Sequence, residues 1–184
     1  MKQSTRVSLK LTEPQPQRDH IQGPHDAVIN MLEYGDYECP YCGAAHGVVK
    51  ALQQELGDRL CFAFRNFPLA NAHPHAQLAA EAAEAAGAQG KFWEMHDMIF
   101  ENQEALEPED LAQYAAIVGI DVPRLVNELR AGVHAPRVRE DFQAGVRAGV
   151  NGTPTFFING ERFDGVPDFE SLLAVLTQST PHHA

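Results

Sequence analysis

The chain has 184 residues, of which 44% are hydrophobic and 21% are charged, so it is long and apolar enough to form one or two domains with a sizeable core. Only three residues are cysteines, which excludes a small scaffold held together by disulfides. Acidic residues number 25 against 14 basic ones, and the formal net charge of -11 argues against nucleic acid and membrane partners, because both require clustered Lys and Arg.

Residues 1–26 form a polar leader in which Pro14 and Pro16 lie close together and no apolar run reaches the length of a signal peptide. No later stretch approaches the about 20 apolar residues that span a bilayer. We therefore expect a cytoplasmic protein, or a periplasmic one if the chain is a trimmed form. Thiols in the cytoplasm are kept reduced, so a close cysteine pair there indicates catalysis or metal binding.

The next part of the chain predicts a strand, a helix and a second strand, which together make a βαβ unit. Residues 27–34 are mostly apolar and end at Gly35, a pattern typical of a buried strand. Residues 60–67 are rich in aromatic side chains and precede Pro68, which indicates the second strand. The helix between them begins at or just before a cysteine pair and is predicted by apolar residues at helical spacing, namely Val48, Val49, Leu52 and Leu56.

The long segment 72–146 has helical periodicity and no strand signal, so we expect a block of helices there. After it, residues 153–158 predict a strand, Asn159 and Gly160 predict a hairpin turn, and residues 161–164 predict the return strand. A last helix is expected to begin near Asp168, because a short acidic side chain suits the N-cap position.

The cysteine pair Cys39 and Cys42 carries the clearest chemical signal. Unpaired backbone N–H groups and the positive end of the helix dipole favour the thiolate of a cysteine at a helix start, which is the position of Cys39. Cys42 lies one turn further on the same face, close enough to attack a mixed disulfide formed on Cys39. Pro40 between them fits the first helical turn, where a missing N–H is tolerated.

Two other interpretations of the pair stay open. Cys39, Cys42 and His46 share one helical face and form half of a zinc site, but structural zinc usually needs a second ligand pair, and none is evident. The second interpretation is that the pair is an inert feature of the surface, without chemical function. His46 itself is interpreted as a residue that packs against another helix.

Several single residues also stand out. Glu33 places a carboxylate in an apolar strand, which is costly unless it has a task or a partner such as Arg65; the alternative is that the strand ends earlier and Glu33 faces solvent. Cys61 is interpreted as a buried small hydrophobe. His73 and His75 mark the entry to the helical segment, with substrate contact as the alternative.

In combination, these motifs resemble the DsbA family of the thioredoxin superfamily. The resemblance rests on the strand with Glu33, on Cys39-Pro-Tyr-Cys42 at a helix start, on the long helical segment, and on Gly152-Thr153-Pro154 before an apolar strand. It implies an α/β thioredoxin fold with a helical domain inserted between the second strand and the cis-Pro strand. The expected boundaries are 27–71 and 147–184 for the thioredoxin-like domain and 72–146 for the inserted helical domain.

The resemblance also implies a role for each candidate site residue. Cys39 would be the nucleophile and Cys42 the resolving cysteine, and Glu33 would lie beneath them and relay protons to the buried thiol. A cis peptide bond before Pro154 would leave the backbone at Thr153 free to pair with an extended substrate. The site needs no cofactor or metal beyond the redox-active cysteines, and its substrate-binding residues are expected to be Pro40, Tyr41, Thr153 and Pro154.

We therefore expect a DsbA-like protein disulfide oxidoreductase that exchanges disulfides with protein substrates, with glutathione or a thioredoxin-type protein as the recycling partner. Tyr41 stands where the periplasmic oxidases carry histidine, and Asp36 and Glu38 precede Cys39. Both differences are expected to disfavour the thiolate and to make the protein a reductase or isomerase rather than a strong oxidase.

Two rival functions remain at this point. One is a glutathione-linked transferase or isomerase of the same architecture, as in the kappa class, although those proteins typically keep a serine at the position of the nucleophile. The other is an adaptor that binds zinc or senses redox state without turnover.

Overall fold

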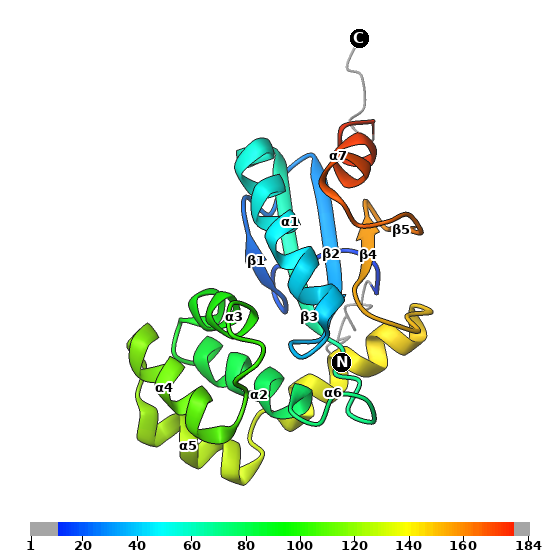
Figure 1. Cartoon of the computed structure of the whole chain (residues 1–184). Coiled ribbons are helices and arrows are strands. Elements are labelled where there is room, and N and C mark those ends of the chain that lie inside the picture. Colours follow the sequence, from blue (N-terminus) through cyan, green and yellow to red (C-terminus); the bar gives the residue numbers. More distant parts are fainter. Residues whose placement is uncertain (1–10, 179–184) are drawn as a thin grey trace, which may run out of the picture.

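The computed structural model describes residues 11–178 and is built around one mixed β-sheet (Figure 1). The sheet has the strand order β1-β3-β2-β4-β5, in which β2 and β3 run parallel and the other neighbours are antiparallel. The strands are β1 (His20–Gln22), β2 (Ile29–Gly35), β3 (Leu60–Asn66), β4 (Thr155–Ile158) and β5 (Glu161–Phe163). Asn159 and Gly160 both have positive φ, which matches the tight turn predicted between the last two strands.

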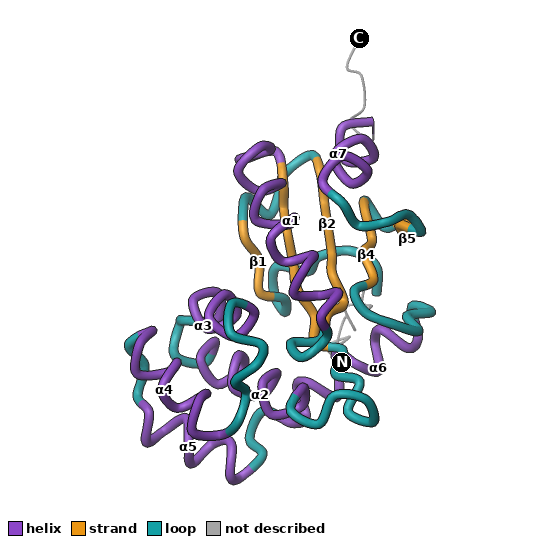
Figure 2. Tube along the Cα trace, viewed as in Figure 1, coloured by secondary structure: helices purple, strands orange, loops and turns teal. Residues whose placement is uncertain are grey.

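Helices cover the sheet and extend to one side of it (Figure 2). The long helix α1 lies against the sheet and packs on α7, whereas α2 to α5 gather in a separate layer with no strand among them. This arrangement confirms the predicted thioredoxin fold with an inserted helical block. The helices are α1 (Pro40–Leu56), the 3-10 turn Gly57–Arg59, α2 (Ala76–Gly87), α3 (Phe92–Phe100), α4 (Pro108–Val118), α5 (Val122–Ala131), α6 (Ala135–Arg147) and α7 (Phe169–Gln178).

The central strands bury both of their faces, and the alternation of side chains decides which residues meet. Met31 on β2 belongs to the larger hydrophobic cluster, which includes α1 and α7. Leu32 and Tyr34 belong to a smaller cluster on the other face, together with Ala144 of α6. Because successive strand residues point to opposite faces, Glu33 lies on the same face as Met31, beneath α1.

Part of the predicted leader belongs to the sheet, which corrects the expectation for residues 20–22. These residues form β1 and pair antiparallel with β3, from His20 opposite Phe64 to Gln22 opposite Phe62. Three residues are too few to show a hydrophobic period, so the sequence carried no strand signal there. The first 10 residues of the leader lie outside the described part of the chain.

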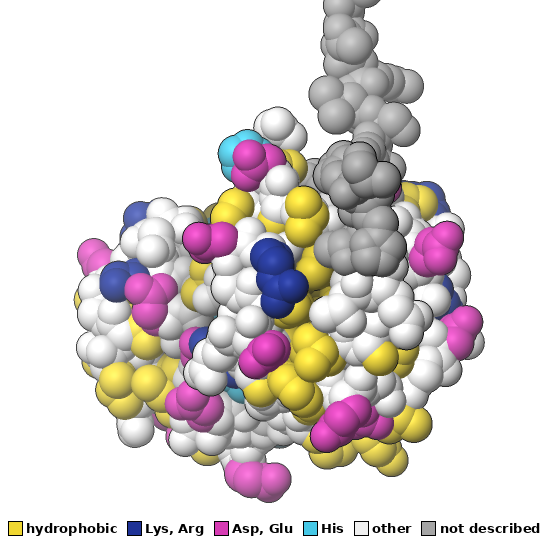
Figure 3. Space-filling model, turned by 90° about the horizontal axis from the view of Figure 1, so that it is seen from above, with side chains coloured by type: hydrophobic (Ala, Val, Ile, Leu, Met, Phe, Trp, Pro, Cys, Tyr) yellow, Lys and Arg dark blue, Asp and Glu magenta, His cyan; other side chains and the backbone are white. Residues whose placement is uncertain are grey.

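The surface is acidic without a continuous basic patch on the face seen in Figure 3, where Lys and Arg side chains are separated from one another by neutral and acidic groups. Among residues 11–178, no helix has the length and apolar character needed to cross a bilayer.

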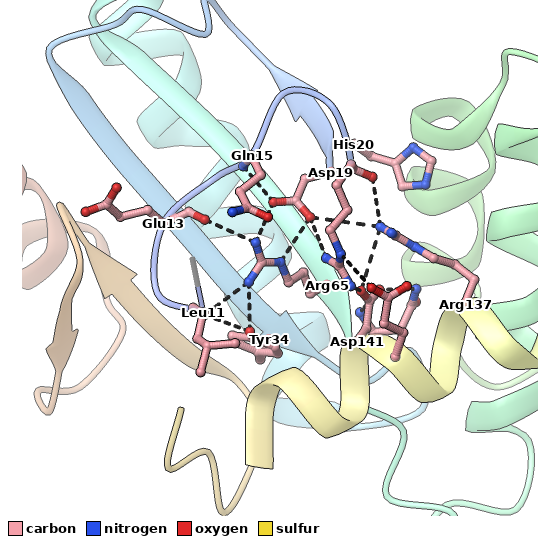
Figure 4. Close-up of polar contacts among 12 residues, drawn as sticks. Leu11, Glu13, Gln15, Asp19, His20, Tyr34, Arg65, Arg137 and Asp141 are labelled. Carbon is pink, nitrogen blue, oxygen red and sulfur yellow. Dashed lines mark hydrogen bonds and ion pairs between the residues drawn. The ribbon is translucent and has the colours of Figure 1, made fainter. Parts of the chain in front are cut away.

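Segment 11–19 is held against β3 by a network of buried ionic groups around Arg65 (Figure 4). Arg65 is fully buried and binds both carboxylate oxygens of Asp19, at 3.0 and 2.7 Å. Its guanidinium also donates to the backbone oxygens of Leu11 and Glu13, at 3.0 and 3.1 Å, and to the hydroxyl of Tyr34 at 2.9 Å. Arg65 thus makes a bidentate contact with the Asp19 carboxylate and single hydrogen bonds with the neutral groups, so charge and hydrogen bonding order a segment that has little apolar content.

The same network continues to α6 and the helical layer. Arg18 bridges Asp19, at 2.7 Å, and Asp141 of α6. Asp141 in turn accepts hydrogen bonds from the backbone N–H and the side-chain amide of Asn66, both at 3.2 Å. Burial raises the pKa of Asp141, and the neighbouring Arg137 and Arg18 oppose that shift. The polar leader is therefore anchored at the junction of the sheet and the helical layer.

Candidate active site

The two active-site thiols lie at the start of α1. Cys39 is the N-cap residue, with φ -73° and ψ 121°, and Pro40 occupies the first helical turn. The Cys39 sulfur lies 3.4 Å from the carbonyl oxygen of Thr153, to which the neutral thiol donates a hydrogen bond. The Thr153–Pro154 peptide bond is cis, as the resemblance implied. The structure thus brings the segment at Thr153 and Pro154, more than a hundred residues away in the chain, against the nucleophile.

Tyr41 is the most exposed residue at this point, with 74% of its surface open to solvent, whereas Cys39 is 4% exposed. An exposed aromatic ring next to a nearly covered sulfur gives an approaching chain an apolar contact beside the reacting atom. Tyr41 therefore offers an exposed apolar surface beside the two thiols.

The environment of Cys39 stabilises its thiolate and lowers the pKa to about 5. The largest cause is the hydrogen bond from the Cys42 thiol; burial opposes it, and the Thr153 side chain and the backbone N–H groups of Cys42 and Tyr41 add to it. The Thr153 hydroxyl oxygen is buried and makes no hydrogen bond among the described residues, so it remains available to the thiolate. At neutral pH Cys39 is mostly a thiolate, the form that attacks disulfides.

Cys42 has the opposite character. Its side chain is completely buried, and burial, together with the hydrogen bond to Cys39 and the nearby charges of Glu33 and Cys39, raises the pKa of Cys42 well above its ordinary value. The backbone N–H of Asp36 donates to its sulfur at 3.4 Å. One thiol of the pair is thus ionised and the other stays protonated, which is the asymmetry that nucleophile and resolving thiol require.

Glu33 is buried beneath α1, at 3% exposure, rather than facing solvent. Its Oε1 oxygen has no hydrogen-bond partner among residues 11–178, and burial, followed by the charge of Cys39, raises the pKa of Glu33 to about 8. A carboxyl that is mostly protonated at pH 7 but keeps an ionised fraction, and that lies close enough to perturb Cys42, can exchange a proton with that thiol.

Replacing Glu33 with Gln is expected to change how stability depends on pH. The carboxyl has a pKa near 4.5 when unfolded and about 8 when folded, so the folded state holds an extra proton between these values. The Glu33 carboxyl therefore makes stability fall as pH rises through this window, by up to ~5 kcal/mol, whereas the Cys39 thiol, with its pKa lowered to about 5, makes it rise. Glu33→Gln removes only the first contribution, so the stability of the variant relative to wild type should grow with pH. Urea unfolding at a series of pH values measures it.

The same variant should turn over disulfides ~10-fold more slowly at pH 7, because the buried thiol loses its proton acceptor. Glu94→Gln serves as the control, since Glu94 is exposed and paired with Lys91 at 2.7 Å. A wild-type pH slope in Glu33→Gln would show that this carboxyl is not the group that titrates.

Arg65 is not the partner of Glu33, and the strand register gives the reason. Glu33 lies opposite Phe64, whereas Arg65 lies opposite Tyr34, so the carboxylate and the guanidinium point to opposite faces of the sheet. Cys61 points to the same face as Arg65, and burial, with the charge of Asp19, raises its pKa to about 11. It behaves as the buried, unreactive cysteine that the sequence predicted.

The two carboxylates before Cys39 are neutralised by histidines. His73 Nδ1 binds Asp36 at 2.8 Å, and His75 Nδ1 binds Glu38 at 2.8 Å while its backbone N–H binds the same carboxylate at 2.6 Å. The expectation that Asp36 and Glu38 oppose the thiolate is therefore corrected: each acid holds a cation or hydrogen-bond donor of its own.

His73 also interacts electrostatically with Cys39, although it is not among the main causes of the lowered pKa of that thiol. Burial lowers the pKa of His73, but the hydrogen bond and charge of Asp36, followed by the charge of Cys39, raise it overall. The Glu38 hydrogen bond raises the pKa of His75 in the same way. The thiolate and His73 stabilise each other, although a histidine so far along the chain gave no sign of this in the sequence.

Gln103, in the loop after α3, is a functional residue that sequence reasoning missed. Its side-chain amide donates to the backbone oxygens of Tyr37 and Cys39, at 2.8 and 2.9 Å, and so holds both sides of the active-site turn. A Cβ at Gly43 would overlap the Gln103 side chain, so the glycine allows this close approach. A glycine inside a predicted helix was the one available signal.

The zinc alternative for the cysteine pair finds no support in the geometry. His46 lies against α3, where its Nε2 is 3.6 Å from Asp97 Oδ1. Within the part of the chain that is described, neither Cys39 nor Cys42 belongs to a group of three or more side chains close enough to share a metal.

Comparison with known proteins identifies the family. A sequence model described as Thioredoxin matches residues 15–178. The chain belongs to the thioredoxin family. Its fold is that of DsbA-like oxidoreductases: BdbD from Bacillus subtilis superimposes with a TM-score of 0.83 at 24% identity, covering 92% of this chain and 96% of that one. DsbA1 from Wolbachia pipientis superimposes with a TM-score of 0.79 at 19% identity, covering 93% and 94%.

Closer sequence relatives are much longer proteins. The chain is 44% identical over 164 residues to a Na(+)/H(+) antiporter NhaA of Salinispora arenicola, and 45% identical over 175 residues to one of a Mycobacterium species. These matches cover 89% and 92% of this chain but 25% and 28% of the relatives. This thioredoxin-family chain thus spans about a quarter of the length of those antiporters.

Proposed function

We propose that the protein exchanges disulfides with protein substrates and that it works as an isomerase or reductase rather than as a strong oxidase. The observation that carries this proposal is the split between the two thiols, one with a pKa lowered to about 5 and the other with a pKa raised by burial. Two cysteines with no such asymmetry would have no defined order of attack.

Reduction of a substrate follows from the positions of the two sulfurs. The Cys39 thiolate attacks one sulfur of the substrate disulfide, and the other substrate sulfur leaves as a thiolate and takes up a proton. Cys42 then gives its proton to the ionised fraction of Glu33 and attacks the Cys39 sulfur. The second substrate sulfur leaves as a thiolate and takes up a proton from Glu33 or water, and a Cys39–Cys42 disulfide remains. Two electrons pass from the pair to the substrate, and glutathione or a thioredoxin-type protein would return them.

The substrate would dock beside Thr153 as an extended segment. Backbone hydrogen bonds to such a segment bind many sequences with little preference, and Tyr41 would add an apolar contact. Pro40 and Pro154 would line the same approach on either side of the Cys39 sulfur.

The reduction potential is the experiment that tests the proposal. The pKa of about 5 lies between about 3.5 for DsbA and about 7 for thioredoxin, whose potentials are about -120 and -270 mV. Interpolation gives about -180 mV, close to the potential of protein disulfide isomerase. Equilibration with defined ratios of reduced and oxidised glutathione measures this value directly.

At a potential of about -180 mV, the reduced form of the pair would be about 20 times as abundant as the oxidised form in a glutathione pool at about -220 mV. An isomerase needs this reduced form. Reactivation of scrambled ribonuclease by the reduced protein should then exceed that of a Cys42→Ser variant. A value above about -140 mV would contradict the proposal and indicate an oxidase.

A further inference from the structure

A second group of polar side chains lies one helical turn beyond the thiols, where α1 contacts α3. It consists of His46 on α1 and of His96 and Asp97 on α3, each of which offers a ligand atom within 4.8 Å of the other two. None of these residues takes part in disulfide exchange as described above, and the sequence analysis considered His46 only as a packing residue or as a zinc ligand shared with the cysteine pair.

The donor atoms in this group are held in place and only partly satisfied. Asp97 Oδ1 is buried and makes no hydrogen bond among the described residues. His96 is 3% exposed, and the Tyr37 hydroxyl lies 2.9 Å from its Nδ1, which fixes the orientation of the ring. Outer hydrogen bonds of this kind are the usual means by which proteins orient metal-binding histidines.

The surroundings keep both imidazoles available as ligands. The ring of Phe100 stacks on His46 with centroids 5.0 Å apart, and Trp93 packs against His96 at 5.0 Å. Burial lowers the pKa of His46 and lowers the pKa of His96 well below its ordinary value. An imidazole in its neutral form offers a lone pair that a cation can bind.

We propose that His46, His96 and Asp97 bind a divalent transition metal ion, with Zn²⁺ as the best match. Two imidazole nitrogens and one carboxylate oxygen are ligands that zinc prefers, and a set of three leaves the fourth tetrahedral position to water or to an outside ligand. A tetrahedral site needs ligand atoms about 3.4 Å apart. The 3.6 Å between His46 Nε2 and Asp97 Oδ1 is already near that spacing.

Lys50 occupies the other side of the same carboxylate and makes the proposal sharply testable. Its ammonium binds Asp97 Oδ2 at 2.6 Å, and its side chain is 38% exposed. The Lys50 ammonium already pairs with the Asp97 carboxylate, and its positive charge would repel a metal ion bound to the same carboxylate. Lys50 should therefore weaken metal binding. Because the side chain is long and partly exposed, it can swing into solvent when the metal binds.

The test is a titration with Zn²⁺ in a Cys39→Ser/Cys42→Ser form of the full chain, so that the active-site thiols cannot bind the metal. Isothermal titration calorimetry should show one site, and His46→Gln should weaken it by at least ~10-fold. Lys50→Gln should tighten binding by a factor of ~3 or more, because it removes a nearby like charge. Cobalt in place of zinc should give the strong visible absorption of a tetrahedral site.

His134→Gln is the matched control, since His134 binds Glu128 at 2.8 Å elsewhere in the helical layer and should leave zinc affinity unchanged. Circular dichroism of His46→Gln without metal shows whether the variant is folded. Equal zinc affinity in His46→Gln and in its parent would place the metal at other histidines and overturn the assignment. Absence of binding by the parent at ~100 μM zinc would overturn it as well.

Discussion

Cys39→Ser is expected to abolish disulfide exchange, by at least ~10³-fold, whereas Cys42→Ser should keep the first attack and accumulate mixed disulfides. The reason is the difference between the two sulfurs: Cys39 is stabilised as a thiolate at the helix start, and Cys42 is buried and protonated. Turnover of a model protein disulfide, with gel analysis of trapped complexes under non-reducing conditions, distinguishes the two variants.

Cys61→Ala is the control for this pair, because Cys61 lies on the other face of the sheet and should leave turnover within about twofold of wild type. Alkylation of the reduced protein at pH 6 should label Cys39 first. Faster labelling of Cys42 would contradict the assignment of roles.

Arg65→Met is expected to destabilise the protein by ~3–5 kcal/mol, because it leaves the carboxylate of Asp19 buried without its main partner. Although burial raises the pKa of Asp19, its hydrogen bonds and ion pair with Arg65 hold that pKa below the ordinary value. Urea unfolding followed by circular dichroism measures the loss in the free energy of unfolding.

Arg124→Met provides the comparison, since Arg124 makes an exposed ion pair with Glu128 and should change stability by less than ~1 kcal/mol. The double variant Asp19→Asn/Arg65→Met should lose less than the sum of the single variants, because it no longer buries an unpaired charge. A loss below ~1 kcal/mol in Arg65→Met would mean that the leader is held by other contacts.

Those parts of the fold that depend on apolar periodicity could be predicted from the sequence. The buried strands, the helix at Cys39 and the helical segment each repeat over enough residues to show a period. Glu33 was also found in this way, since a carboxylate in an apolar strand breaks the pattern. The strand β1 and the contacts of the buried Arg65 were not predicted, because both depend on partners that come together only in the folded chain.

The same distinction applies to the candidate site, where some residues carry a local sequence signal and others do not. Cys39 and Cys42 lie three positions apart in the sequence, and this spacing alone indicates their chemistry. His73 and Gln103 reach the same turn from the helical segment, and single histidine or glutamine residues carry no local signal of such a contact. The electrostatics of Cys39 were therefore misjudged from Asp36 and Glu38 alone.

The contributors to the reactive thiolate are spread widely along the chain, and this has a consequence for biosynthesis. During translation, Cys39 is made well before Gln103 and Thr153. Until α1 has formed and packed against the segment at Thr153, the groups that acidify the Cys39 sulfur are not in place around it, and the sulfur behaves as an ordinary thiol, with a pKa near 8.5. A nascent chain is thus poorly reactive toward other unfinished proteins, and the nucleophile becomes active only when the last of its supports has been synthesised and packed.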